Sequence, residues 1–78
     1  MRFVSYDRIV EIIRTNPGIA TPDLAVRAYP DIWPESYNFY NARNRLYHQL
    51  QVLLKNGRIV RTGYVPGTTH TSTWEVVA

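Results

Sequence analysis

Hydrophobic residues recur at helical spacing in the middle of the chain, between Glu35 and Gly57. Their intervals of three or four residues, at about 100° per residue, place them in one narrow stripe. The stripe consists of Phe39, Ala42, Leu46, Leu50 and Leu53. We expect one long amphipathic helix that begins at Glu35 or nearer Asn38, ends at Asn56-Gly57, and packs this stripe against a hydrophobic core.

The opposite side of this helix carries amide and cationic side chains and no carboxylate. These residues are Asn41, Asn44, Arg45, His48, Gln51 and Lys55. Asn and Gln form paired hydrogen bonds with adenine, Arg does so with guanine, and Lys or protonated His attracts the phosphodiester backbone. This face therefore indicates a nucleic-acid partner. The alternative is a solvated helix face without a partner.

The N-terminal part of the chain predicts a first helix from Tyr6 to Thr15. Ser5 is expected to cap its start through the hydroxyl group. Asn16-Pro17-Gly18 is expected to end it, because proline cannot continue the hydrogen-bond ladder and glycine tolerates positive φ. The short lead-in from Met1 to Val4 is expected to pack against the body of the domain.

A second helix is predicted from Pro22 to Ala28 or Tyr29. Thr21 is the expected N-cap, and Pro22 suits the first helical position because its missing N–H has no partner there. Pro30 is expected to stop the helix. The sequence thus predicts a short helix between two turns.

Four hydrophobic side chains lie outside the regular pattern. Ile19 stands alone between turn signals and predicts either a short strand or a plug. Trp33 is expected to be a core or lid residue rather than a platform for a ligand. Tyr40 and Tyr47 lie beside the buried stripe, and packing against the core is favoured over hydrogen bonding to a phosphate.

After Gly57 the hydrophobic pattern changes from helical to alternating. Two segments rich in β-branched and aromatic residues, Arg58–Val65 and Thr71–Val77, predict strands. Pro66–His70 forms the expected tip between them. The sequence therefore predicts an α+β domain of three helices followed by a C-terminal two-stranded antiparallel hairpin.

Composition places the chain among small basic proteins. Its 78 residues correspond to one domain, and the absence of cysteine excludes a disulfide framework and favours an intracellular, cytoplasmic protein. The net charge is +3, with five cations and one acid after residue 35. Neither a signal peptide nor a membrane span is evident.

Catalytic and metal-binding patterns are not evident. His48 and His70 are the only histidines and have no neighbouring carboxylate cluster. Ser36 and Ser72 lack a base and an oxyanion hole arranged around them. We therefore expect no enzymatic activity, no metal, no cofactor and no small-molecule substrate.

The order of these elements resembles that of winged helix-turn-helix DNA-binding domains. The similarity is carried by Thr21-Pro22-Asp23-Leu24-Ala25 in the second helix, by Leu50 and Leu53 ahead of Lys55–Arg61, and by Trp74 in the last strand. It covers nearly the whole chain. The resemblance implies that the third helix enters the major groove of double-stranded DNA and that the hairpin reaches an adjacent backbone or minor groove.

The resemblance also implies roles for individual residues. Asn41, Asn44, Arg45 and His48 are the expected contacts to base edges. Thr21, Arg43, Tyr47, Lys55 and Arg61 are expected to position the duplex, Thr21 through nearby backbone N–H groups. Gln51 belongs to the same interface. These roles indicate a transcriptional regulator or an accessory factor.

A rival interpretation is a protein-interaction module with the same fold. This rival would be favoured if four apolar residues, Ile32, Trp33, Val52 and Leu54, formed one contiguous exposed patch. A homodimer is compatible with either interpretation, because two copies could contact two half-sites.

Overall fold

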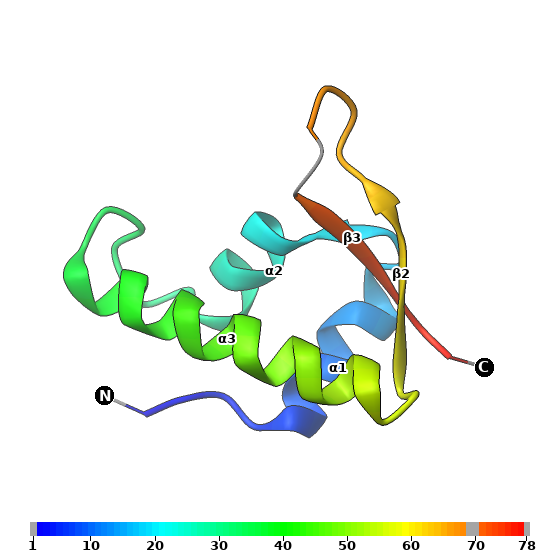
Figure 1. Ribbon diagram of the computed structural model, residues 1–78. Helices are drawn as coiled ribbons and strands as arrows, with labels where there is room; N and C mark the ends of the chain where they lie inside the picture. Colours follow the sequence, from blue (N-terminus) through cyan, green and yellow to red (C-terminus); the bar gives the residue numbers. More distant parts are fainter. Residues whose placement is uncertain (1, 69–70, 78) are drawn as a thin grey trace.

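A computed structural model describes residues 2–68 and 71–77 of the chain (Figure 1). Within these residues the chain forms three α-helices and one three-stranded antiparallel sheet, which confirms the α+β class. The elements are α1 (Tyr6–Thr15), β1 (Ile19–Ala20), α2 (Thr21–Ala28), α3 (Tyr37–Lys55), β2 (Ile59–Tyr64) and β3 (Ser72–Val76). The expectations for Met1, Thr69 and His70 concern positions outside the described residues.

Helix α1 has the predicted bounds and the predicted cap. The Ser5 hydroxyl accepts a hydrogen bond from the Arg8 amide at 3.1 Å, which satisfies one of the donors left open at a helix start. Asn16 ends the helix, and Gly18 follows with a φ of 80°. The Gly18 amide then donates to the Trp74 carbonyl at 2.9 Å, so this turn leads directly into the sheet.

Helix α2 begins one residue earlier than expected, and the assignment of Thr21 as its N-cap is wrong. The cap is Ala20, whose side chain makes no capping hydrogen bond. Thr21 is buried, and its hydroxyl accepts a hydrogen bond from Trp74 Nε1 at 2.8 Å and donates one to the Ser72 carbonyl at 3.2 Å. The hydroxyl that was expected to cap α2 is therefore bonded to strand β3 instead. The helix ends at Ala28, as predicted.

The sheet has three strands, so the two-stranded prediction is wrong in this respect. Ile19 pairs with Trp74 in β1, and the strand order is β1-β3-β2. Ile19 was expected to form either a short strand or a plug. It lies in a strand, and its side chain is also buried. The β2–β3 hairpin agrees with the prediction, each strand being one residue shorter at both ends than expected.

Helix α3 starts within the predicted interval and ends where predicted. The Ser36 hydroxyl accepts from the Phe39 amide at 3.1 Å and caps the start. At the other end Gly57 adopts a φ of 74°, while its amide and that of Arg58 donate to Leu54 and Leu53. This pair of bonds closes the last turn and needs a residue that accepts positive φ.

The core lies between the three helices and one face of the sheet. All five members of the predicted α3 stripe are buried, together with side chains from α1, α2 and β3. In Figure 1, α3 crosses the molecule from the α2–α3 loop to the sheet, and the tip of the hairpin extends beyond the helices. Trp33 is 70% exposed, so its expected place in the core or as a lid is wrong.

Candidate nucleic-acid interface

The polar face of α3 lies at the surface, because the buried stripe occupies the other side of the helix. Arg45, His48, Gln51 and Lys55 are exposed, whereas Asn41 and Asn44 are half-buried. All six predicted residues are thus accessible from one side, over almost four turns of a single rigid element. Such a row presents amide, imidazole and cationic donors to a partner.

Among the described residues, no carboxylate side chain forms an ion pair with this surface. Helix α3 contains no Asp or Glu. In the part of the chain that the structure describes, the two ion pairs are Arg14–Glu11 at 2.7 Å and Arg58–Asp7 at 3.3 Å. Both involve α1, and neither takes a cation from α3. Arg43, Arg45 and Lys55 therefore keep their charge available for an anionic partner.

Tyr40, Arg43 and Tyr47 form a second group on one flank of α3. The Arg43 guanidinium lies 5.5 Å from the centre of the Tyr40 ring and 5.9 Å from that of Tyr47, which permits cation–π attraction to both. The tyrosines are 51% and 41% exposed, so the preference for core packing is wrong for both. They hold Arg43 in place instead.

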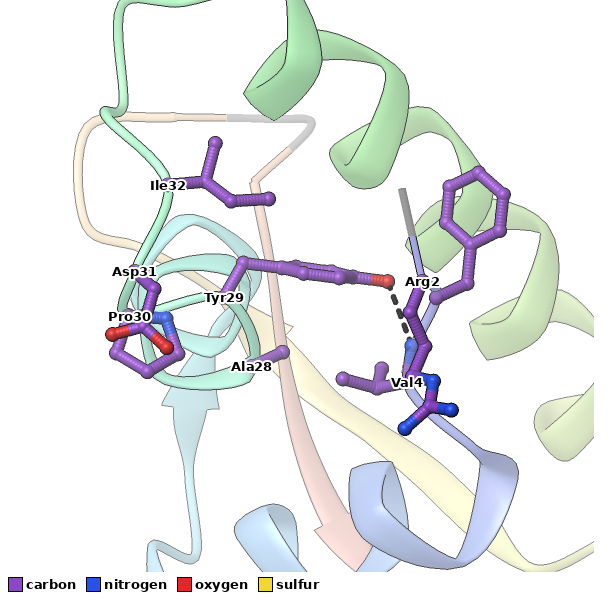
Figure 2. Close-up of a pocket in the computed structure, with 8 residues that line it drawn as sticks. Arg2, Val4, Ala28, Tyr29, Pro30, Asp31 and Ile32 are labelled. Carbon is purple, nitrogen blue, oxygen red and sulfur yellow. Dashed lines mark hydrogen bonds between the residues drawn. The ribbon is translucent and has the colours of Figure 1, made fainter.

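The opposite flank of α3 contacts the N-terminal segment, an arrangement that the sequence reasoning missed in detail. The Arg45 guanidinium lies over the Phe3 ring at 5.7 Å. Figure 2 shows the Tyr29 hydroxyl, which accepts a hydrogen bond from the Val4 amide at 3.1 Å. Gln49 Nε2 donates to the Val4 carbonyl at 2.9 Å. The expectation that this segment packs against the body is confirmed for Val4.

Gln49 is a buried residue of α3 that the hydrophobic pattern does not predict. It is 2% exposed and continues the helical series of Ala42 and Leu46 toward Leu53. This spacing alone predicts a buried position. The hydrophobic pattern does not include Gln49, because it counts only apolar residues. Gln49 also helps to place Phe3 beneath Arg45, because it holds the adjacent residue, Val4.

No family model, curated protein or solved structure matches this chain.

The two predicted interface residues outside α3 differ in accessibility. The Thr21 side chain is buried and its hydroxyl is bonded within the domain. The expected phosphate contact through backbone N–H groups near Thr21 does not involve this hydroxyl and stays a prediction. Arg61 is exposed on β2. Both residues line a concavity of about 360 Å³ together with Tyr47 and Gln51 of α3, which joins the helix to the hairpin.

The four residues proposed for a protein-binding patch do not form one. Ile32 and Leu54 are partly buried and pack against the core. Trp33 and Val52 are exposed, but Trp33 precedes α3 and Val52 lies in its last turns. A rise of about 1.5 Å per residue separates Val52 from the helix start by about 20 Å. The two most exposed large hydrophobic side chains among the described residues are aromatic and lie near the start of α3, at Trp33 and Tyr37.

Among the described residues, no group of three His, Asp or Glu side chains is placed to hold a metal ion. His48 is exposed on α3, while His70 lies outside the described part of the chain. In the same residues, no helix has the length and apolar character needed to cross a membrane.

Proposed function

We propose that the protein is a winged helix-turn-helix domain that binds double-stranded DNA by inserting α3 into the major groove. The observation that carries this proposal is the exposed, acid-free face of α3 opposite a fully buried stripe. The major groove is about 12 Å wide and accepts an α-helix, and its edges present acceptors and donors that amide and guanidinium groups match. Transcriptional regulation is the activity that best suits such a domain.

The flanks of α3 support the same proposal. Arg43 between its two tyrosines and Arg61 on β2 lie to one side of the polar face, where they can contact a phosphate backbone. Arg45 lies on the other flank, over Phe3, with Asn41, Asn44 and His48 beside it on the helix. In this arrangement Arg45, Asn41, Asn44 and His48 contact base edges, and Arg43, Lys55 and Arg61 position the duplex.

A second candidate function is a protein-interaction surface at the start of α3. Trp33 and Tyr37 are 70% and 77% exposed, and Tyr40 follows one turn later. Aromatic side chains of this kind are enriched in the centres of protein interfaces. Sedimentation of the purified protein tests self-association through this surface, and a homodimer would be compatible with DNA binding through the rest of α3.

We expect the affinity for a fluorescently labelled random duplex to fall with increasing salt. If Arg43, Lys55 and Arg61 each neutralise one phosphate, the logarithm of the association constant should fall with a slope of about −2.7 against the logarithm of salt concentration. The affinity should then decrease about 40-fold between 50 and 200 mM salt. Fluorescence anisotropy measures both values. The absence of an anisotropy change on adding protein to the duplex at 50 mM salt would refute the proposal.

A further inference from the structure

Four side chains share one face of the β2–β3 hairpin because of an irregularity in its register. Arg61 pairs with Trp74 and Tyr64 pairs with Ser72, while the register shifts between Arg61 and Gly63. Paired residues lie on the same face of an antiparallel sheet, as do residues two apart on one strand. Arg61 and Tyr64 are three apart, so a regular strand would place them on opposite faces. The extra residue in the bulge brings them together.

The resulting group fixes the orientation of the Arg61 guanidinium. Its Nε donates to Ser72 Oγ at 2.9 Å, and its centre lies 5.3 Å from the Trp74 ring and 6.0 Å from the Tyr64 ring. Ser72 and Trp74 are buried and therefore give the arginine a rigid base. Within residues 2–68 and 71–77, neither terminal nitrogen of Arg61 has a hydrogen-bond or ion-pair partner. The N–H groups of these two nitrogens remain for a ligand.

The concavity beside Arg61 has the chemistry of an anion site. Residues of α2, α3, β2 and β3 line its volume of about 360 Å³, and none of them is acidic. Tyr47 and Gln51 of α3, which carry a hydroxyl and an amide, are among the lining residues. The Arg43 guanidinium does not line the concavity, but it lies 5.9 Å from the ring of Tyr47, which does.

We propose that this concavity binds one phosphate group, which accepts two parallel hydrogen bonds from the terminal nitrogens of Arg61 and further bonds from Tyr47 and Gln51. A planar guanidinium matches two phosphate oxygens at once, which a lysine ammonium cannot do. The inference deepens the proposed function, since the phosphate belongs to a DNA strand only if the protein binds DNA. The shared ligand chemistry is a phosphate oxygen pair, in a phosphodiester or as free phosphate.

Nuclear magnetic resonance of the full chain tests the site without any substitution. The Arg61 Nε–H signal and the Gln51 side-chain amide signals are followed during separate titrations with inorganic phosphate and with a random duplex. Both ligands are expected to shift these signals and to saturate them, with chloride at equal ionic strength as the reference. If neither ligand shifts the Arg61 signal more than chloride does, the proposal is wrong.

A pair of variants adds a quantitative test. Arg61→Lys keeps the positive charge but loses the planar guanidinium with its two terminal nitrogens. We expect it to lower duplex affinity about 5- to 10-fold. Arg58→Lys is the matched control: Arg58 is exposed and pairs with Asp7, and the change should alter affinity less than about 2-fold. Equal effects of the two variants would overturn the proposal.

The outcomes separate this inference from the proposed function. Duplex binding that leaves the Arg61 and Gln51 signals unchanged would overturn the phosphate site and leave DNA binding intact. Saturable shifts with inorganic phosphate in a protein that does not bind duplex would support the site, identify free phosphate as the ligand, and refute the proposed function.

Discussion

Replacing Arg45 with glutamate is expected to lower duplex affinity at least about 30-fold. Arg45 is exposed on α3 and, within the described residues, is not part of an ion pair. The substitution removes a charge-assisted hydrogen bond and places a carboxylate beside the phosphates, effects that together exceed about 2 kcal/mol. Each 1.4 kcal/mol corresponds to about a tenfold change in affinity. Anisotropy titration with one duplex at fixed salt measures the difference.

Arg8→Glu provides the matched control for this prediction. Arg8 is exposed in the first turn of α1, where a carboxylate is favourable next to the positive end of the helix dipole. Both variants change the net charge by the same amount, so a purely non-specific attraction would respond equally to each. We expect Arg8→Glu to lower affinity less than about 3-fold, because α1 lies outside the proposed interface. Equal losses would remove the case for a specific role of α3.

Replacing Leu50 with alanine is expected to cost about 2 to 5 kcal/mol in the free energy of unfolding. Leu50 is 1% exposed and belongs to the stripe that α3 packs into the core. A domain of this size has a total stability of about 4 to 12 kcal/mol, from about 0.05 to 0.15 kcal/mol per residue. A loss of this size is a large fraction of the total, so the variant should unfold at a clearly lower urea concentration than the unsubstituted protein. Urea denaturation followed by circular dichroism measures the change.

Val52 is the control for the position of the stripe. It lies two residues from Leu50 on the same helix and is 42% exposed. Val52→Ala should change the free energy of unfolding by less than about 0.5 kcal/mol, since surface substitutions away from special features have small effects. If Val52→Ala costs as much as Leu50→Ala, α3 does not pack with the orientation described, and its polar face is not at the surface.

The helices were largely predictable because their signals are local. The intervals of three and four residues in α3 indicate its buried side, and Asn56-Gly57 marks its end by backbone geometry alone. The same holds for α1, where Ser5 caps the first turn. In each case the residues that determine the structure lie within one or two turns of the feature that they determine.

The errors arise where partners are distant in sequence. Thr21 looks like an N-cap, but its hydroxyl is bound by Trp74, which lies 53 residues away. Ile19 is in a strand because it pairs with Trp74 at the edge of β3. No local pattern carries this information, since pairing with β3 depends on how the whole chain folds back. The third strand and the buried threonine therefore emerge only from the structure.

The sequence predicts the polar side of α3, but it does not predict the contacts that orient Arg43 and Arg61. Helical spacing indicates the polar side of α3, and in the structure four of its six residues are exposed and two are half-buried. The contacts that order Arg43 and Arg61 depend on Tyr40 being exposed and on a bulge before Gly63, and a one-residue change of register reverses which face a strand residue occupies. Sequence alternation alone does not predict that change.

The most direct measurement is a backbone amide spectrum of the isotopically labelled protein, recorded as a duplex is added. We predict that the largest shift changes occur along the exposed side of α3, from Asn41 to Lys55, and at Arg61, while the amides of α1 change little. Shift changes confined to Trp33 and Tyr37, or spread evenly over all helices, would contradict insertion of α3 into the major groove.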